Sequence, residues 1–99
     1  MPAIDHPPLH LQATAGQALT IKLDAIPGAG AMWQTPSAPA GCSLVLADTV
    51  PSGPGVGGTA SQHFVLTCSQ AGEQHLRFEL KRSWESEVRA VQAVVVSVK

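Results

Sequence analysis

The chain has 99 residues, which is the size of one small domain because a typical domain runs about 100–150 residues. Six Lys and Arg stand against seven Asp and Glu, and without a basic excess no nucleic acid partner is expected. No apolar run approaches the ~18–20 residues of a membrane span, so no membrane association is expected. A single soluble domain over residues 1–99 is therefore predicted.

The first eight residues differ in character from the rest. Residues 1–8 contain three prolines and little apolar surface, which predicts a loose N-terminal lead-in. They lack the basic and apolar regions of a signal peptide, which predicts a cytoplasmic protein. If a signal peptide has been removed, the protein is periplasmic or secreted instead, and two cysteines are too few to identify the compartment.

Alternating apolar and polar residues, and apolar runs bounded by Gly and Pro, predict short strands along the whole chain. Trp33, in a short segment at 31–34, is expected in the core. The last segment is ambiguous because its apolar residues also fit helical spacing, but its six valines favour a strand, with an irregularity at Gln92. The predicted strands cover residues 9–12, 19–24, 31–34, 42–46, 64–68, 75–81 and 88–98. About seven strands and no helix predict an all-β antiparallel sandwich.

The centre of the chain predicts a hairpin. Six of the eight residues at 51–58 are Gly or Pro, so this stretch must be a loop. Folding the two flanking strands symmetrically about Gly55 gives a definite register. It pairs Leu46 with Phe64, Leu44 with Leu66, and Cys42 with Cys68.

Two cysteines face each other in this register. Cys42 and Cys68 lie on the apolar side of their strands with no Lys or Arg beside them, which argues against a catalytic thiol. Either a pair of core thiols or a cross-strand disulfide fits the positions. The inter-sheet bridge of antibody domains is not matched, because neither cysteine lies on the second or sixth predicted strand.

Residues that carry catalysis or bind metals are sparse. The four histidines show no metal-ligand spacing, and the last three fall on the outward side of their strands. No nucleophile elbow, phosphate-binding loop or dinucleotide fingerprint occurs. No enzyme activity, metal or cofactor is therefore expected. The histidines are His6, His10, His63 and His75.

Three connections of the predicted sandwich emerge at the same end. They span residues 26–31, 51–58 and 82–87, and two of them are rich in glycine. The third carries Trp84, which either is exposed to meet a partner or folds back over the edge of the core. Arg82, at the end of a strand, is expected to hold this loop by hydrogen bonds to backbone carbonyls.

These loops resemble the signatures of the chagasin-type inhibitors of papain-like cysteine peptidases, which are Asn-Pro-Thr-Thr-Gly-Tyr/Phe-x-Trp, Gly-x-Gly-Gly and Arg-Pro-Trp. Residues 26–33 keep the Pro, the Gly and the Trp of the first signature, but Gly28 and Ala29 replace both threonines and Ala31 replaces the aromatic residue. Residues 55–58 match the second signature completely, and residues 82–84 match the third except that Ser83 replaces Pro. The resemblance covers nearly the whole chain.

The resemblance implies an immunoglobulin-like sandwich that acts as a reversible inhibitor of papain-like cysteine peptidases and is a monomer. The three loops, 26–33, 51–59 and 82–87, would block the active-site cleft, with weaker or narrower inhibition because the first signature is incomplete. The alternative is a non-inhibitory immunoglobulin-like module that binds another protein with the same end. The residues implied in peptidase binding are Pro27, Gly28, Ala29, Gly30, Ala31, Gly55, Val56, Gly57, Gly58, Arg82, Ser83 and Trp84.

Overall fold

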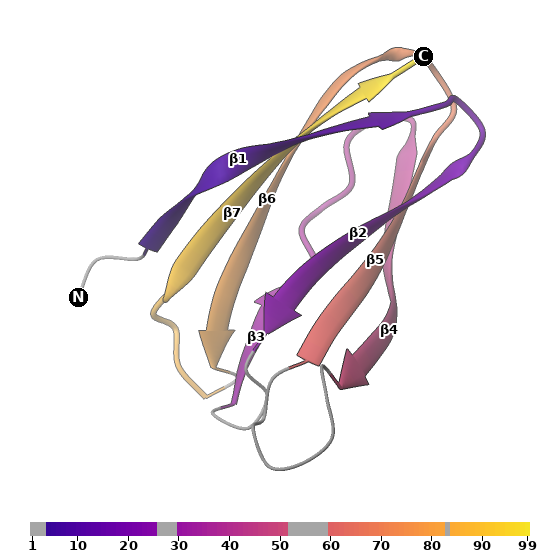
Figure 1. Ribbon diagram of the computed structural model, residues 1–99. Helices are drawn as coiled ribbons and strands as arrows, with labels where there is room; N and C mark the ends of the chain where they lie inside the picture. Colours follow the sequence, from indigo (N-terminus) through magenta and orange to yellow (C-terminus); the bar gives the residue numbers. More distant parts are fainter. Residues whose placement is uncertain (1–3, 26–29, 52–59, 83) are drawn as a thin grey trace.

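The computed structural model describes residues 4–25, 30–51, 60–82 and 84–99. These residues form seven strands in two sheets, with strand orders β1-β7-β6-β3 and β2-β5-β4 (Figure 1). No helix long and apolar enough to cross a membrane is found in this part of the chain. The predicted all-β sandwich of about seven strands is confirmed. The strands are β1 (Ile4–Ala13), β2 (Ala18–Ala25), β3 (Ala31–Gln34), β4 (Cys42–Pro51), β5 (Ala60–Cys68), β6 (Gly72–Arg82) and β7 (Ala90–Val98).

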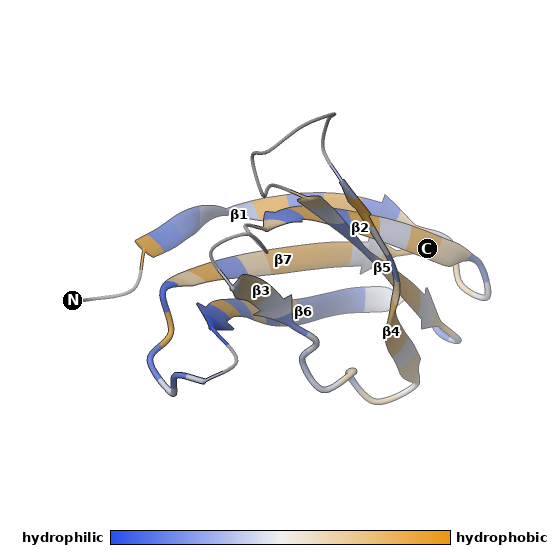
Figure 2. Cartoon of the chain, turned by 90° about the horizontal axis from the view of Figure 1, so that it is seen from below, coloured by the Kyte–Doolittle hydropathy of each residue, from blue (hydrophilic) through white to orange (hydrophobic). Residues whose placement is uncertain are grey.

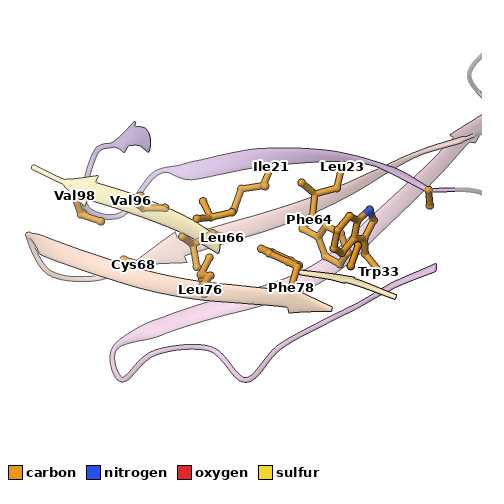
Figure 3. Close-up of a cluster of buried hydrophobic side chains, with 13 residues drawn as sticks. Ile21, Leu23, Trp33, Phe64, Leu66, Cys68, Leu76, Phe78, Val96 and Val98 are labelled. Carbon is orange, nitrogen blue, oxygen red and sulfur yellow. The ribbon is translucent and has the colours of Figure 1, made fainter. Parts of the chain in front are cut away.

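The two sheets meet through the apolar sides of their strands. Alternation along β5, and along β6 as far as Phe78, sends every second side chain inward, as the period of two along a strand requires. β7 is hydrophobic along most of its length (Figure 2), because it lies between two neighbours in the larger sheet. Figure 3 shows side chains of both sheets pointing toward one another. The ring centroids of Phe64 and Phe78 lie 4.8 Å apart. The core consists of Ile21, Leu23, Ala25, Trp33, Phe64, Leu66, Cys68, Leu76, Phe78, Ala90, Val94, Val96 and Val98.

The first strand corrects one prediction. Residues 1–8 were expected to form a loose lead-in, but β1 begins at Ile4 and runs parallel to β7, so one pair of this otherwise antiparallel sandwich is parallel. Pro7 and Pro8 lie at a shift of the register between His6 and Leu9. A bulge in an edge strand tolerates proline because no ladder hydrogen bond is needed there. The imidazole ring of His6 lies 6.2 Å from the Trp33 ring, which gives this end of β1 a partner in the core.

The irregularity expected at Gln92 lies in the strand beside it. β7 begins at Ala90 rather than at 88 and pairs with β6 without interruption, whereas the shift occurs in β1 opposite Gln92. The buried Gln92 donates hydrogen bonds from Nε2 to the carbonyl oxygens of Pro7 (2.9 Å) and Ala93 (2.8 Å). A polar residue in an apolar strand therefore supplies a donor to a carbonyl at the bulge.

The predicted register of the central hairpin is confirmed. Cys42 pairs with Cys68, and the pairing continues as predicted to Leu46, after which the register shifts before Asp48. Cys42 and Cys68 form a disulfide with their Cα atoms 4.0 Å apart, so of the two alternatives the disulfide is the one found. In the chain-entropy model, closing a loop of this length stabilises the fold by roughly 3–4 kcal/mol. The disulfide lies at the opposite end of the hairpin from residues 51–60.

β3 has a neighbouring strand on one side only, and on its other side a side chain of the smaller sheet bonds its backbone. β3 is an edge strand of four residues that pairs with β6 only. Gln62 of β5, which is 1% exposed, accepts a hydrogen bond at Oε1 from the Trp33 backbone N–H (2.7 Å) and donates from Nε2 to the Trp33 carbonyl (3.1 Å). The Trp33 indole N–H donates to the Asp24 carbonyl of β2 at 2.7 Å. Three hydrogen bonds therefore tie the short strand to the opposite sheet.

Candidate functional site

The strand register brings three connections to one end of the sandwich. Ala60, at the start of β5, pairs with Ala25 at the end of β2 and with Pro51 at the end of β4. Ala31, at the start of β3, pairs with Arg82 at the end of β6. The ends of these strands converge, as Figure 1 shows. The strand ends that flank the three connections therefore lie at one end of the sandwich, as predicted.

Four of the twelve residues implied in peptidase binding lie in the described part of the chain. Gly30 precedes β3, Arg82 is the last residue of β6, and Trp84 lies two residues after it. Ala31 is buried at the first position of β3, so its side chain faces the core and not a partner. The other eight lie outside the described residues: Pro27, Gly28, Ala29, Gly55, Val56, Gly57, Gly58 and Ser83.

Trp84 is the most exposed of the large hydrophobic residues in the described part of the chain, at 68%. It therefore does not fold back over the edge of the core, which was the alternative left open by the sequence. Its indole ring lies beside the Arg82 guanidinium, whose central carbon is 5.8 Å from the ring centroid, within the range of a cation–π contact. A large aromatic surface that a loop holds out to solvent is typical of a binding site for another protein.

An ion-pair network closes the loop that carries Trp84. The Glu85 carboxylate lies 3.2 Å from Nη1 of Arg82 and 3.1 Å from Nη2 of Arg89. The backbone N–H of Glu85 donates to the Arg82 carbonyl at 3.1 Å, and that of Arg89 donates to the Leu80 carbonyl at 2.7 Å. Arg82 was expected to bond backbone carbonyls, and its guanidinium bonds the Glu85 carboxylate instead. Its expected role of holding the loop fits this arrangement.

The same network shifts the titration of Glu85. Burial alone raises the pKa of this carboxyl, but the hydrogen bonds and positive charges of Arg89 and Arg82 outweigh it, so the pKa is lowered. A group whose pKa is lower in the folded than in the unfolded state stabilises the fold above its unfolded pKa. This stabilisation is lost as the pH falls through the lowered value.

We therefore expect Glu85→Gln to lower the melting temperature at neutral pH. At a pH below the pKa of Glu85 in the folded protein, the carboxyl of the unsubstituted protein is also neutral, so the two proteins should have similar melting temperatures. The measurement is thermal unfolding of both proteins from pH 7 to pH 2. Glu73→Gln is the matched control, because Glu73 lies on the exposed side of β6, where its ion-pair partner is His75 and not an arginine. A difference between Glu85→Gln and the unsubstituted protein that stays constant over this pH range would show that the ion pairs do not stabilise the fold.

Two features of this end of the molecule were not predicted from the sequence. Glu85 lies three residues after Arg82, and Arg89 lies four residues after Glu85. This alternation of charge was the available signal. The hydrogen bonds of Gln62, which hold β3 and so the residue after Gly30, gave no signal because alternation along β5 predicts only that this side chain points inward, and not which backbone groups it bonds. In the described residues, no three His, Cys, Asp or Glu side chains gather as a metal site would require.

Comparisons with known proteins agree with this geometry. The sequence model of the chagasin family of peptidase inhibitors, I42, matches residues 12–98. No curated protein sequence matches the chain. Among solved structures, the cysteine protease inhibitor EhICP2 from Entamoeba histolytica is 18% identical, with a TM-score of 0.68 and 100% of both chains covered. Amebosin is 22% identical, with a TM-score of 0.67 and 100% of both chains covered.

A third similar structure is that of a complex. PbICP-C, solved in complex with falcipain-2, is 14% identical with a TM-score of 0.72, and the match covers 98% of this chain and 91% of that chain. At these identities the three structures show that the fold is shared. The immunoglobulin-like sandwich implied by the sequence is therefore confirmed.

Proposed function

Because the chain belongs to the chagasin family of peptidase inhibitors, we propose that it is a reversible inhibitor of papain-like cysteine peptidases that blocks the active-site cleft with one end of the sandwich. The observation that carries the proposal is the exposed Trp84 at the end where three loops converge. Tryptophan buries a large area with few rotamers to fix, which makes it a common source of binding energy in interfaces. Inhibition requires no chemistry from the inhibitor itself.

The three loops have different roles in the proposal. The glycines at 55–58 allow main-chain N–H and C=O groups to approach the cleft as a bound strand would. The loop at 26–33 approaches the catalytic thiol, and Trp84 packs beside the cleft. Three such loops are enough for a contact of the standard size for protease inhibitors, about 800 Å² on each partner.

The direct test is titration of papain activity with the purified protein, followed by mass spectrometry of the inhibitor. We expect a concentration-dependent loss of activity, recovery on dilution, and an uncleaved inhibitor. A cathepsin-L-like peptidase serves as a second target, because the incomplete first signature predicts narrower inhibition. If neither enzyme is inhibited at high micromolar concentration, the alternative, a non-inhibitory immunoglobulin-like binding module, is favoured.

A further inference from the structure

The exposed Trp84 ring rests against a glycine of a different loop. Gly30 precedes β3, and the pairing of Ala31 with Arg82 brings it close to the end of β6. A Cβ atom added to Gly30 would lie 2.7 Å from Cζ3 of Trp84 and closer still to Cη2. Real Cβ atoms do not approach other atoms this closely, so a side chain at residue 30 would require the Trp84 ring to move from this position.

The backbone at Gly30 imposes the same choice independently. Its φ angle is +80°, in the left-handed region that residues with a side chain rarely adopt. The conformation turns the chain into β3. Two separate requirements, a positive φ and space for an indole ring, therefore coincide at one glycine.

The indole ring also lies near a charged group that is itself held in place. The guanidinium of Arg82 lies 5.8 Å from the ring centroid, and its Nη1 bonds Glu85, which in turn bonds Arg89. Gly30 is tied to the opposite sheet through the hydrogen bonds of Gln62 to Trp33, three residues later. Both groups that contact the ring are thus attached to the framework of strands.

We infer that Gly30 is a positioning residue for Trp84, which fixes the orientation in which the indole ring is presented to the peptidase. The inference rests on the proposed function, and adds that the loop before β3 contributes to inhibition through Trp84 as well as by any contact of its own. A side chain that is already oriented loses less conformational freedom on binding, so its position contributes to affinity without a new contact. The two loops then act as one surface.

The test is a double-mutant cycle of Gly30→Ala and Trp84→Ala, with papain inhibition as the readout. We expect Gly30→Ala to weaken inhibition by about tenfold or more in the unsubstituted background, and by less than about twofold when Trp84 is already alanine. Gly16→Ala is the matched control. Gly16 has a φ of +81° with no atom within 4 Å of an added Cβ, and its N–H bonds the Cys68 carbonyl at the far end of the sandwich. The Gly16→Ala substitution should leave papain inhibition unchanged. An equal loss from Gly30→Ala in both backgrounds, or no loss, would overturn the inference.

A second measurement separates this inference from the proposed function. In proton NMR spectra, the α protons of Gly30 should carry a ring-current shift that Trp84→Ala abolishes, and Gly30→Ala should move the indole proton signals of Trp84 while Gly16→Ala leaves them in place. These spectra need no peptidase. Gly30 shifts that are unchanged by Trp84→Ala would disprove the contact even if papain is inhibited. Lack of inhibition with the expected shifts would reject the proposed function and retain the positioning of Trp84.

Discussion

Trp84→Ala is expected to weaken papain inhibition at least about thirtyfold, which corresponds to about 2 kcal/mol of binding free energy. The reason is that the ring is 68% exposed in the free protein and becomes buried only when a partner covers it. For the same reason the substitution leaves no cavity in the core, so the melting temperature should change by no more than about 3 °C. The change in affinity is measured as the inhibition constant for papain, and the change in melting temperature is measured by thermal unfolding of the same preparation.

Val45→Ala is the control for this prediction. Val45 is also an exposed apolar residue, at 55%, but it lies in the middle of β4 and pairs with Val65, away from the converging loops. It should leave both inhibition and melting temperature nearly unchanged. If Trp84→Ala instead lowers the melting temperature by many degrees and leaves inhibition intact, Trp84 is a structural residue and the proposed binding role is wrong.

Gln62→Leu is expected to cause the largest loss of stability among the substitutions considered for this protein. Leucine fills a similar volume but leaves the Trp33 backbone N–H and C=O without partners in the buried interface between the sheets. An unsatisfied buried backbone group costs about 1–3 kcal/mol, so the two together cost roughly 2–6 kcal/mol. For a domain of this size that lowers the melting temperature by roughly 10 °C or more.

Two variants separate this effect from other consequences of the substitution. Gln12→Leu places the same change at an exposed position of β1 and should have little effect on thermal unfolding. The melting temperature of Gln62→Glu should be closer to that of the unsubstituted protein at low pH than at neutral pH. The reason is that only the protonated carboxyl group both donates and accepts hydrogen bonds, as the amide does. A melting temperature of Gln62→Leu equal to that of Gln12→Leu would show that the bridge to Trp33 does not stabilise β3.

The fold was largely predictable because its strongest signals are local. The near-symmetry of the sequence about Gly55 sets the register of β4 against β5 as far as Leu46, and the alternation in β6 identifies its buried side. The disulfide followed from that register as one of two alternatives. The start of β1 was missed because proline disfavours a strand, whereas an edge position with a bulge accommodates Pro7 and Pro8.

The candidate site was predictable only in part because its contacts join residues distant in sequence. Which loops converge follows from strand order alone, but the packing of Trp84 on Gly30 depends on the exact pairing of β3 with β6. The inward orientation of Gln62 and Gln92 can be inferred from the alternation of their strands. The backbone groups that their amides bond cannot be inferred in this way. Composition and periodicity do not specify hydrogen-bond partners between separate strands.

Protection of the catalytic thiol of papain from alkylation tests the central claim most directly, because it reports whether the bound protein occupies the active-site cleft. The thiolate is the reactive form and must be accessible to react. The account predicts that alkylation by iodoacetamide slows in proportion to the fraction of papain in complex, and that Trp84→Ala at the same concentration protects much less. A complex that elutes intact in gel filtration while its thiol is alkylated at the rate of free papain would contradict it.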